Sequence, residues 1–302
     1  MSNPYFTNDP YFGDSESARK ERQKLGLTPA GASAAPAGPY GSYQQPASGT
    51  STLPPIPQAG APAQMDALEH AYAAPAATAY ETGRMTYDDV IMKTGILLGV
   101  IVLVGALAWV APPGIQQMLM IVGLIGGLVL GLVNSFRKKV SVPLILGYAV
   151  FEGLFLGAIS SWFEGQWSGI VMQAILGTLA VFATMLVLFR SGKVRNTPKF
   201  QRIVMLALVG YAVFALVNLV LVWTGVMGGW GMRSGGLGLL IGAAAVVLAA
   251  ATLVIDFDSI QQGVRRGAPA QYSWAAAFGL AVTLVWMYLE ILRILAILRG
   301  DN

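Results

Sequence analysis

From Met85 onward the chain is a succession of seven long apolar segments separated by short polar connections. Each is about as long as the roughly 20 residues that an α-helix needs to cross the 30 Å hydrocarbon core of a bilayer. The segments run approximately over 94–111, 115–136, 140–163, 169–189, 203–224, 235–255 and 273–298. Their apolar character is continuous, without the period-two alternation of a membrane β-barrel. We therefore expect an all-α membrane protein, a bundle of seven transmembrane helices over residues 85–302.

Composition supports this class and excludes others. Charged residues make up 11% of the chain, well below the roughly 25% of soluble domains. The net charge of +4 does not indicate nucleic-acid binding, because the basic residues lie in short connections between apolar segments. Cysteine is absent and His70 is the only histidine, which excludes thiolate chemistry, haem, an intramembrane zinc site and a serine/histidine protease. We expect no enzyme activity, no cofactor and a lipid bilayer as the main partner.

Residues 1–84 differ in composition from the rest and are rich in Pro, Ala, Gly and Ser. Such a segment buries too little apolar surface to offset the entropy of ordering, so we expect a disordered tail. It lacks the apolar core of a signal peptide. The runs Asn3-Pro4-Tyr5-Phe6 and Asp9-Pro10-Tyr11-Phe12 are similar. The repeat is either a docking motif for a cytoplasmic partner or a chance similarity.

The distribution of Lys and Arg predicts the orientation. Basic residues precede the first segment and follow the second, fourth and sixth, whereas the first and third connections have none and the fifth has only Arg233. The basic residues before the first segment and after the second, fourth and sixth are Arg84, Lys93, Arg137, Lys138, Lys139, Arg190, Lys193, Arg195, Lys199, Arg202, Arg265 and Arg266. By the positive-inside rule the N-terminus is cytoplasmic and the C-terminus lies outside.

Five charged side chains interrupt the apolar segments or lie at their edges: Glu152, Asp256, Asp258, Glu290 and Arg293. A charge in hydrocarbon costs about 2.5 to 3.5 kcal/mol even on the lenient insertion scale, so such residues face the protein interior or a wet cavity. An ion or proton pathway is the hypothesis that follows from four acids in these positions.

Acids from the sixth and seventh segments are the sharpest candidates. Residues two apart on a helix point about 200° away from each other, so at most one of Asp256 and Asp258 can face Glu290. Two carboxylates that face each other in a desolvated bundle do not both ionise cheaply and titrate as a unit. A shared proton joins the helices, whereas its loss separates them or recruits a cation, and oxygen ligands suit calcium.

One geometric condition limits this pairing. Glu290 lies about 25 Å along the seventh helix, whereas Asp256 lies near the end of the sixth. The two meet only if the sixth helix continues beyond Asp258, or if the seventh starts late, tilts or breaks near Gly279.

A purely structural polar network is the alternative. Glu290 and Arg293 are three residues apart and can neutralise each other on one helix face. Asp258 can lie beside Arg265 and Arg266, and Glu152 can cap a polar patch. The candidate members of that patch are Asn134, Asn218 and Gln173.

Glycines at four-residue spacing predict close helix packing. They are Gly123, Gly127 and Gly131 in the second segment, and Gly238 with Gly242 in the sixth. Small residues at this spacing allow two backbones to approach closely, through packing within the bundle or through self-association.

Three short stretches resemble the transmembrane Bax inhibitor motif family in its bacterial inner-membrane branch. They are Phe151-Glu152-Gly153-Leu154-Phe155-Leu156-Gly157, Ile255-Asp256-Phe257-Asp258-Ser259-Ile260 and Tyr288-Leu289-Glu290. With the seven-segment layout, the resemblance covers about residues 85–300. The chain departs from the family in having glutamate at position 290, where aspartate is usual, and more residues between the two acids.

The resemblance implies a pH-sensitive calcium leak in a bacterial inner membrane. Its sensor and gate would be Asp256 and Glu290, with Asp258 as the fallback for Asp256, and both acids would contact calcium transiently. Glu152 and Arg293 would line or support the pore. The alternative function is a membrane scaffold or stress-response protein that acts through membrane-protein partners, using its tail and basic connections.

Overall fold

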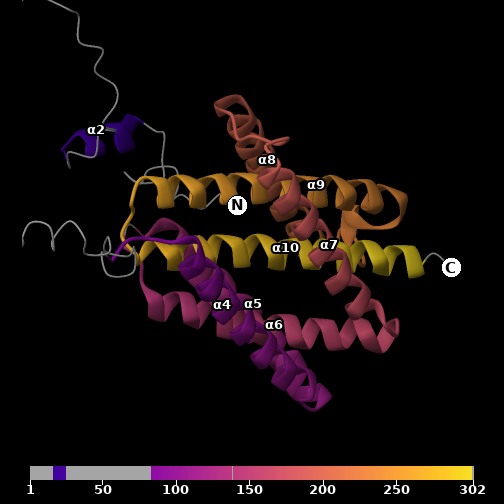
Figure 1. Ribbon diagram of the computed structural model, residues 1–302. Helices are drawn as coiled ribbons and strands as arrows, with labels where there is room; N and C mark the ends of the chain where they lie inside the picture. Colours follow the sequence, from indigo (N-terminus) through magenta and orange to yellow (C-terminus); the bar gives the residue numbers. More distant parts are fainter. Residues whose placement is uncertain (1–15, 25–82, 138, 301–302) are drawn as a thin grey trace, which may run out of the picture.

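The computed structural model describes residues 16–24, 83–137 and 139–300, and within these ranges it confirms the all-α class. Seven helices are long and apolar enough to cross a membrane (Figure 1). They are α4 Tyr87–Trp109, α5 Pro113–Phe136, α6 Val142–Gln166, α7 Ile170–Arg190, α8 Pro198–Trp223, α9 Gly235–Arg265 and α10 Tyr272–Gly300. A single turn of 3-10 helix, η1 Gly231–Arg233, precedes α9. These ranges contain no extended strand, only an isolated bridge between Arg84 and Pro269.

Two helices extend well beyond the apolar segments that predicted them. α9 ends at Arg265, ten residues after the expected limit, and α4 begins at Tyr87, where the Thr86 side chain caps the helix by accepting a hydrogen bond from the Asp89 amide at 3.1 Å. An apolar segment predicts the part of a helix that lies in hydrocarbon, but the backbone hydrogen bonding of the helix continues into the polar residues beyond it. The sixth helix therefore meets the condition that it continue beyond Asp258.

Helix α10 is the centre of the bundle. It packs against α4, α6, α7 and α9, and Met287 and Leu292 are fully buried along it. In Figure 1, α9 and α10 run side by side as the two longest helices, while α8 lies at the edge against α9 and η1. Side chains on α10 therefore face neighbouring helices on most sides.

The glycine spacing predicts packing inside the bundle correctly. A Cβ atom on Gly123 would lie 2.5 Å from the Phe155 amide nitrogen, so only glycine allows α5 and α6 to approach this closely. On α9, Gly242 packs against a side chain instead, and a Cβ atom there would lie 2.6 Å from Ile294 Cγ1 of α10. Self-association through these faces stays a prediction.

One part of the N-terminal region is described. Helix α2, Glu16–Lys24, is rich in charged residues and contains an ion pair between Lys20 and Glu16 at 3.0 Å. Residues 1–15 and 25–82 lie outside the described residues, and with them both copies of the Asn/Asp-Pro-Tyr-Phe motif and His70. The boundary at residue 84 and the disorder of the tail stay predictions.

Candidate functional site

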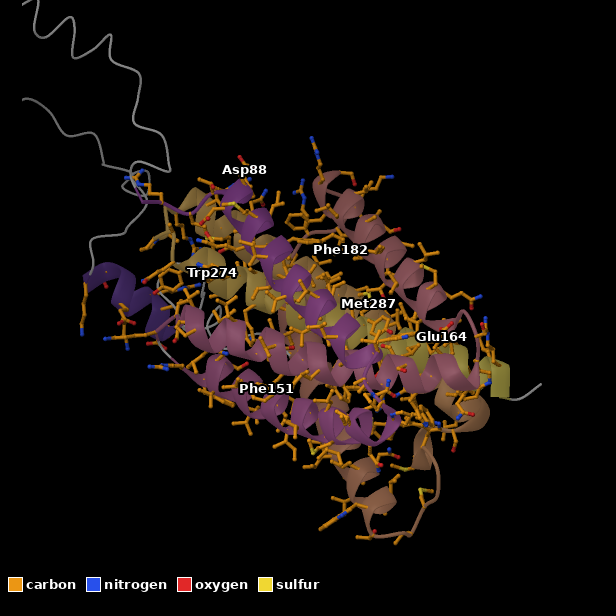
Figure 2. The ribbon with its side chains drawn as sticks, turned by 90° about the horizontal axis from the view of Figure 1, so that it is seen from below. Asp88, Phe151, Glu164, Phe182, Trp274 and Met287 are labelled. Carbon is orange, nitrogen blue, oxygen red and sulfur yellow. The ribbon has the colours of Figure 1, made fainter. Side chains whose placement is uncertain are left out.

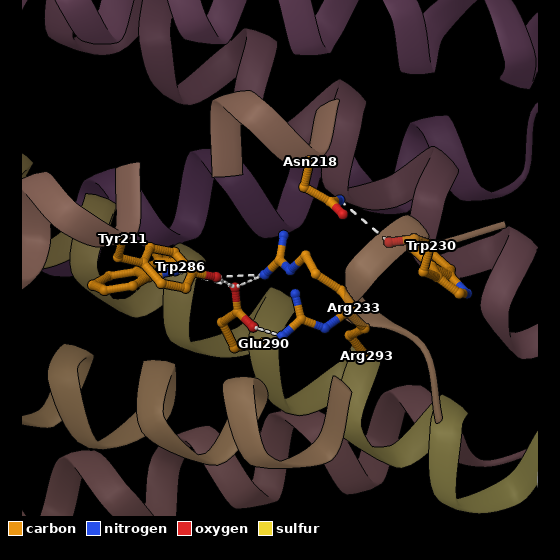
Figure 3. Close-up of polar contacts among 7 residues, drawn as sticks. All are labelled: Tyr211, Asn218, Trp230, Arg233, Trp286, Glu290 and Arg293. Carbon is orange, nitrogen blue, oxygen red and sulfur yellow. Dashed lines mark hydrogen bonds and ion pairs between the residues drawn. The ribbon is translucent and has the colours of Figure 1, made fainter. Parts of the chain in front are cut away.

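Glu290 lies at the centre of a polar cluster between α8, η1 and α10 (Figure 3). Its side chain is buried, and its Oε1 accepts hydrogen bonds from the Tyr211 hydroxyl, Arg233 Nη2 and, at 3.3 Å, Trp286 Nε1. Its Oε2 forms an ion pair with Nη2 of Arg293. One carboxylate thus joins three elements that are far apart in the sequence.

The position of each partner follows from local structure. Trp286, Glu290 and Arg293 lie at i−4, i and i+3 on α10, so helical periodicity brings them to one face. Arg233 is the last residue of η1 and reaches inward from that turn. Tyr211 extends from the middle of α8, and its ring lies 5.6 Å from the Arg233 guanidinium.

The η1 turn is held in place by Asn218 on α8. The Asn218 amide donates to the Trp230 carbonyl at 3.2 Å, and its Oδ1 accepts from the Met232 amide at 2.7 Å. Gly231 adopts φ +63°, and a Cβ atom there would lie 2.5 Å from the Asn218 Oδ1. Glycine is therefore required at position 231, because of its backbone conformation and because the turn lies so close to α8.

The cluster carries an excess of positive charge. It contains one carboxylate and two guanidinium groups, which gives a formal charge of +1 if all three are ionised. Arg293 is 5% exposed, and its Nε has no hydrogen-bond partner within the described residues. The predicted pairing of Glu290 with Arg293 is present, but it forms only part of a larger cluster.

Sequence reasoning missed Arg233 and Tyr211 as members of this site. The available signal was that Arg233 is the only basic residue in its connection, where the positive-inside rule expects none. The structure accounts for that exception, because Arg233 points into the bundle and is paired with Glu290. Tyr211 gave no signal, since an aromatic residue in an apolar segment is ordinary.

Asp256 lies in a different environment on α9. It is 2% exposed, and its Oδ2 accepts a hydrogen bond from the Thr283 hydroxyl of α10 at 2.8 Å. The same hydroxyl lies 3.1 Å from the Gly279 carbonyl. Within the described residues no basic side chain forms an ion pair with Asp256. Asp256 is thus an interior carboxylate, and its hydrogen-bond partner among the described residues is a neutral hydroxyl.

The expected direct contact between Asp256 and Glu290 does not form. Asp256 contacts Thr283, and Thr283 precedes Glu290 by seven residues, or about 10 Å along α10. The continuation of α9 to Arg265 places Asp256 inside the bundle, but two turns short of Glu290. A shared proton is therefore not part of this conformation, and a joint sensing role for the two acids stays a prediction.

Asp258, the fallback member of the pair, is partly buried and faces the connection between α7 and α8. Its Oδ2 accepts hydrogen bonds from Asn196 at 2.9 Å and from Gln262 at 2.6 Å. Of the two aspartates, Asp256 is the one that forms a hydrogen bond with α10, through Thr283.

Glu152 on α6 faces α5 rather than the Glu290 cluster. A Cβ atom on Gly127 would lie 2.7 Å from Glu152 Oε2, so the carboxylate packs directly over this glycine. Of the three alternative partners expected for Glu152, Asn218 binds the backbone at η1 and Gln173 accepts a hydrogen bond from Arg299 at 3.0 Å. Asn134 is buried on α5.

The described residues contain no group of three or more acidic or histidine side chains able to hold a metal ion. Calcium takes six to eight oxygen ligands, so a high-coordination calcium site is not built from clustered carboxylates in this part of the chain. Asp256 and Glu290 each offer one carboxylate to a passing cation, and transient contact with calcium stays a prediction.

Comparison with known proteins gives the family. An uncharacterised protein of Chlamydia muridarum (strain MoPn / Nigg) is 31% identical over 83 residues, which cover 26% of this chain and 35% of that protein. The aligned part is thus about a third of that relative's length. The family model described as Bax inhibitor 1 like matches residues 3–300, and so extends further toward the N-terminus than the motif resemblance did. The chain therefore belongs to the Bax inhibitor 1-like family.

Proposed function

We propose that this multi-pass membrane protein is a pH-sensitive leak for cations, calcium first and protons as the alternative, with Asp256 as the group whose protonation controls passage. The observation that carries the proposal is the burial of the Asp256 carboxylate against the central helix with Thr283 as its hydrogen-bond partner. An ionisable acid in the interior of a membrane domain is costly, and such residues typically mark an ion or proton pathway.

The Thr283 hydroxyl suits both protonation states of Asp256. It donates to an ionised carboxylate at 2.8 Å. When Asp256 is protonated, the acid can donate to the hydroxyl, which then donates to the Gly279 carbonyl 3.1 Å away. The closed bundle therefore accommodates the neutral acid without a lost hydrogen bond, whereas the ionised acid attracts a cation. We expect the leak to increase as pH rises.

In this proposal Glu290 has a different role from Asp256. Its negative charge is already compensated by Arg233 and Arg293, so it holds helices and η1 together in the closed state. Asp256 on α9 contacts α10 at Thr283, and Glu290 lies two turns further along α10. The two acids therefore act at separate positions rather than as one pair that shares a proton.

A cytoplasmic N-terminus in a bacterial inner membrane is part of the proposal. The segment 190–202, which contains the connection between α7 and α8, supports this orientation, because it has five basic side chains, all of them exposed, and an excess of Lys and Arg is typical of cytoplasmic connections. These residues are Arg190, Lys193, Arg195, Lys199 and Arg202. Arg233 at the opposite end of the bundle is withdrawn into the Glu290 cluster.

Calcium release from reconstituted liposomes across pH tests the function. Wild-type protein should leak faster at higher pH, and Asp256→Asn, which imitates the neutral acid, should leak slowly at every pH. Parallel loading with a proton indicator separates calcium from proton passage. Vesicles that keep both ions at all pH values, together with a cellular phenotype that follows deletion of residues 1–84, would favour the scaffold function instead.

A further inference from the structure

We propose that the connection 224–234 is a gate at its end of the bundle, and that Arg233 acts in it as a tethered cation that occupies Glu290. The inference rests on the proposed cation leak and adds to it a second closure, independent of Asp256. Figure 3 shows the arrangement, in which the Arg233 guanidinium extends from η1 to the Glu290 carboxylate.

Arg233 takes up the ligands that a cation would use. Its Nη2 binds both the Tyr211 hydroxyl oxygen and Oε1 of Glu290. A hydroxyl and a carboxylate oxygen are the kind of ligands that calcium and other hard cations prefer. While Arg233 is in place, these oxygens are unavailable to a passing ion.

Withdrawal of Arg233 would also change the charge of the site. Glu290 would keep its ion pair with Arg293, so the formal charge would fall from +1 to zero. A net positive charge in a low-dielectric surrounding repels cations strongly, and its removal lowers that barrier. The same movement thus exposes oxygen ligands and removes a repulsive charge.

The connection can move without unfolding a membrane helix, because the described contacts that hold it to the helices are side-chain hydrogen bonds, ring contacts and the Arg233 ion pair. Asn218 binds the backbone of η1 through two hydrogen bonds, and the Trp230 ring stacks on Phe163 of α6 with centroids 5.8 Å apart. Most of residues 223–230 are exposed. Gly225, Gly229 and Gly231 have positive φ, so the connection contains three backbone positions that favour glycine.

Chemical rescue tests the gate. Arg233→Gly should raise the calcium leak of proteoliposomes at least tenfold, on the order expected for loss of one unit charge beside the path. Guanidinium ion added to the medium should then reseal the variant, because it can occupy the vacated position. Arg195→Gly, which removes an exposed arginine from the connection between α7 and α8, is the matched control and should leak at the wild-type rate.

The outcomes distinguish the gate from the underlying leak. If Asp256→Asn suppresses the leak but Arg233→Gly leaves it unchanged, the gate is wrong and the leak stands. A leaky Arg233→Gly that guanidinium does not reseal also overturns the gate, since Arg233 would then act only in packing. If neither variant alters ion release, the proposed function itself fails. Should Arg233→Gly not fold, Asn218→Ala decides, because it frees η1 with Arg233 intact and must raise the leak.

Discussion

Thr283 on α10 donates its hydroxyl hydrogen bond to Asp256 on α9 across 2.8 Å, two helical turns before Glu290 on the same helix. The central helix therefore carries two polar positions with different chemistry. At one, a neutral hydroxyl meets a carboxylate, and at the other two guanidinium groups meet a carboxylate. The two positions are separated by Met287, which lies on α10 between Thr283 and Glu290 and is fully buried (Figure 2).

Replacement of Thr283 by valine should move the pH response of the leak. Valine keeps the shape of the side chain but removes the hydroxyl that stabilises ionised Asp256. The loss of a buried hydrogen-bond partner costs about 1–3 kcal/mol, and the cost is larger for ionised Asp256 than for the neutral acid, because hydrogen bonds to charged groups are stronger. We expect the rise of calcium release to shift to higher pH, as measured in proteoliposomes. Thr283→Ser, which keeps the donor, is the control, and identical profiles for both variants would contradict the role of this hydrogen bond.

Asp258→Asn should leave the pH dependence of ion release close to that of the wild type. Asp258 binds Asn196 and Gln262 outside the contact between α9 and α10, so its charge does not face the central helix. Flux profiles of Asp258→Asn and Asp256→Asn, measured side by side, check this assignment. Loss of the pH response in the Asp258 variant would transfer the sensing role to that residue.

Substitution of Gly123 by alanine should destabilise the protein by about 1–3 kcal/mol, the usual cost of overpacking. Its Cβ atom would meet backbone atoms of α6, 2.5 Å from Phe155 N and 2.7 Å from Phe151 O, and backbone cannot rotate aside. Gly131→Ala is a matched control on the same helix, since its nearest neighbour would be Tyr148 at 3.5 Å, an ordinary contact. Thermal unfolding in detergent should separate the two variants, and equal midpoints would contradict this account of the helix contact.

The fold was largely predictable because apolar length alone determines which segments cross a bilayer. The ends of the helices were harder to predict, as the continuation of α9 to Arg265 illustrates. An apolar segment ends at the first polar residues, whereas the hydrogen bonding of the helix continues through them. The pairing of Glu290 with Arg293 followed from helical spacing, which is local information.

Contacts between distant segments were not predictable. Arg233 and Glu290 are separated by 57 residues, and no local pattern indicates that a turn before α9 reaches α10. The expected pairing of Asp256 with Glu290 came from motif resemblance and from the expectation that charged residues in membrane segments face the protein interior. It did not form because the relative depth of two helices depends on their packing, which placed Asp256 opposite Thr283.

Removal of the Glu290 charge should be more harmful than removal of a whole ion pair. Glu290→Gln leaves Arg233 and Arg293 buried without a counter-charge, and breaking a buried pair in this way costs about 3–5 kcal/mol. The double variant Glu290→Gln/Arg293→Gln removes one charge of each sign, so it should recover part of that loss and unfold at a higher temperature than Glu290→Gln alone. A thermal unfolding cycle over the wild type, both single variants and the double variant measures the coupling. Additive effects would mean that the two residues do not stabilise each other, and that Arg233 alone balances the charge of Glu290.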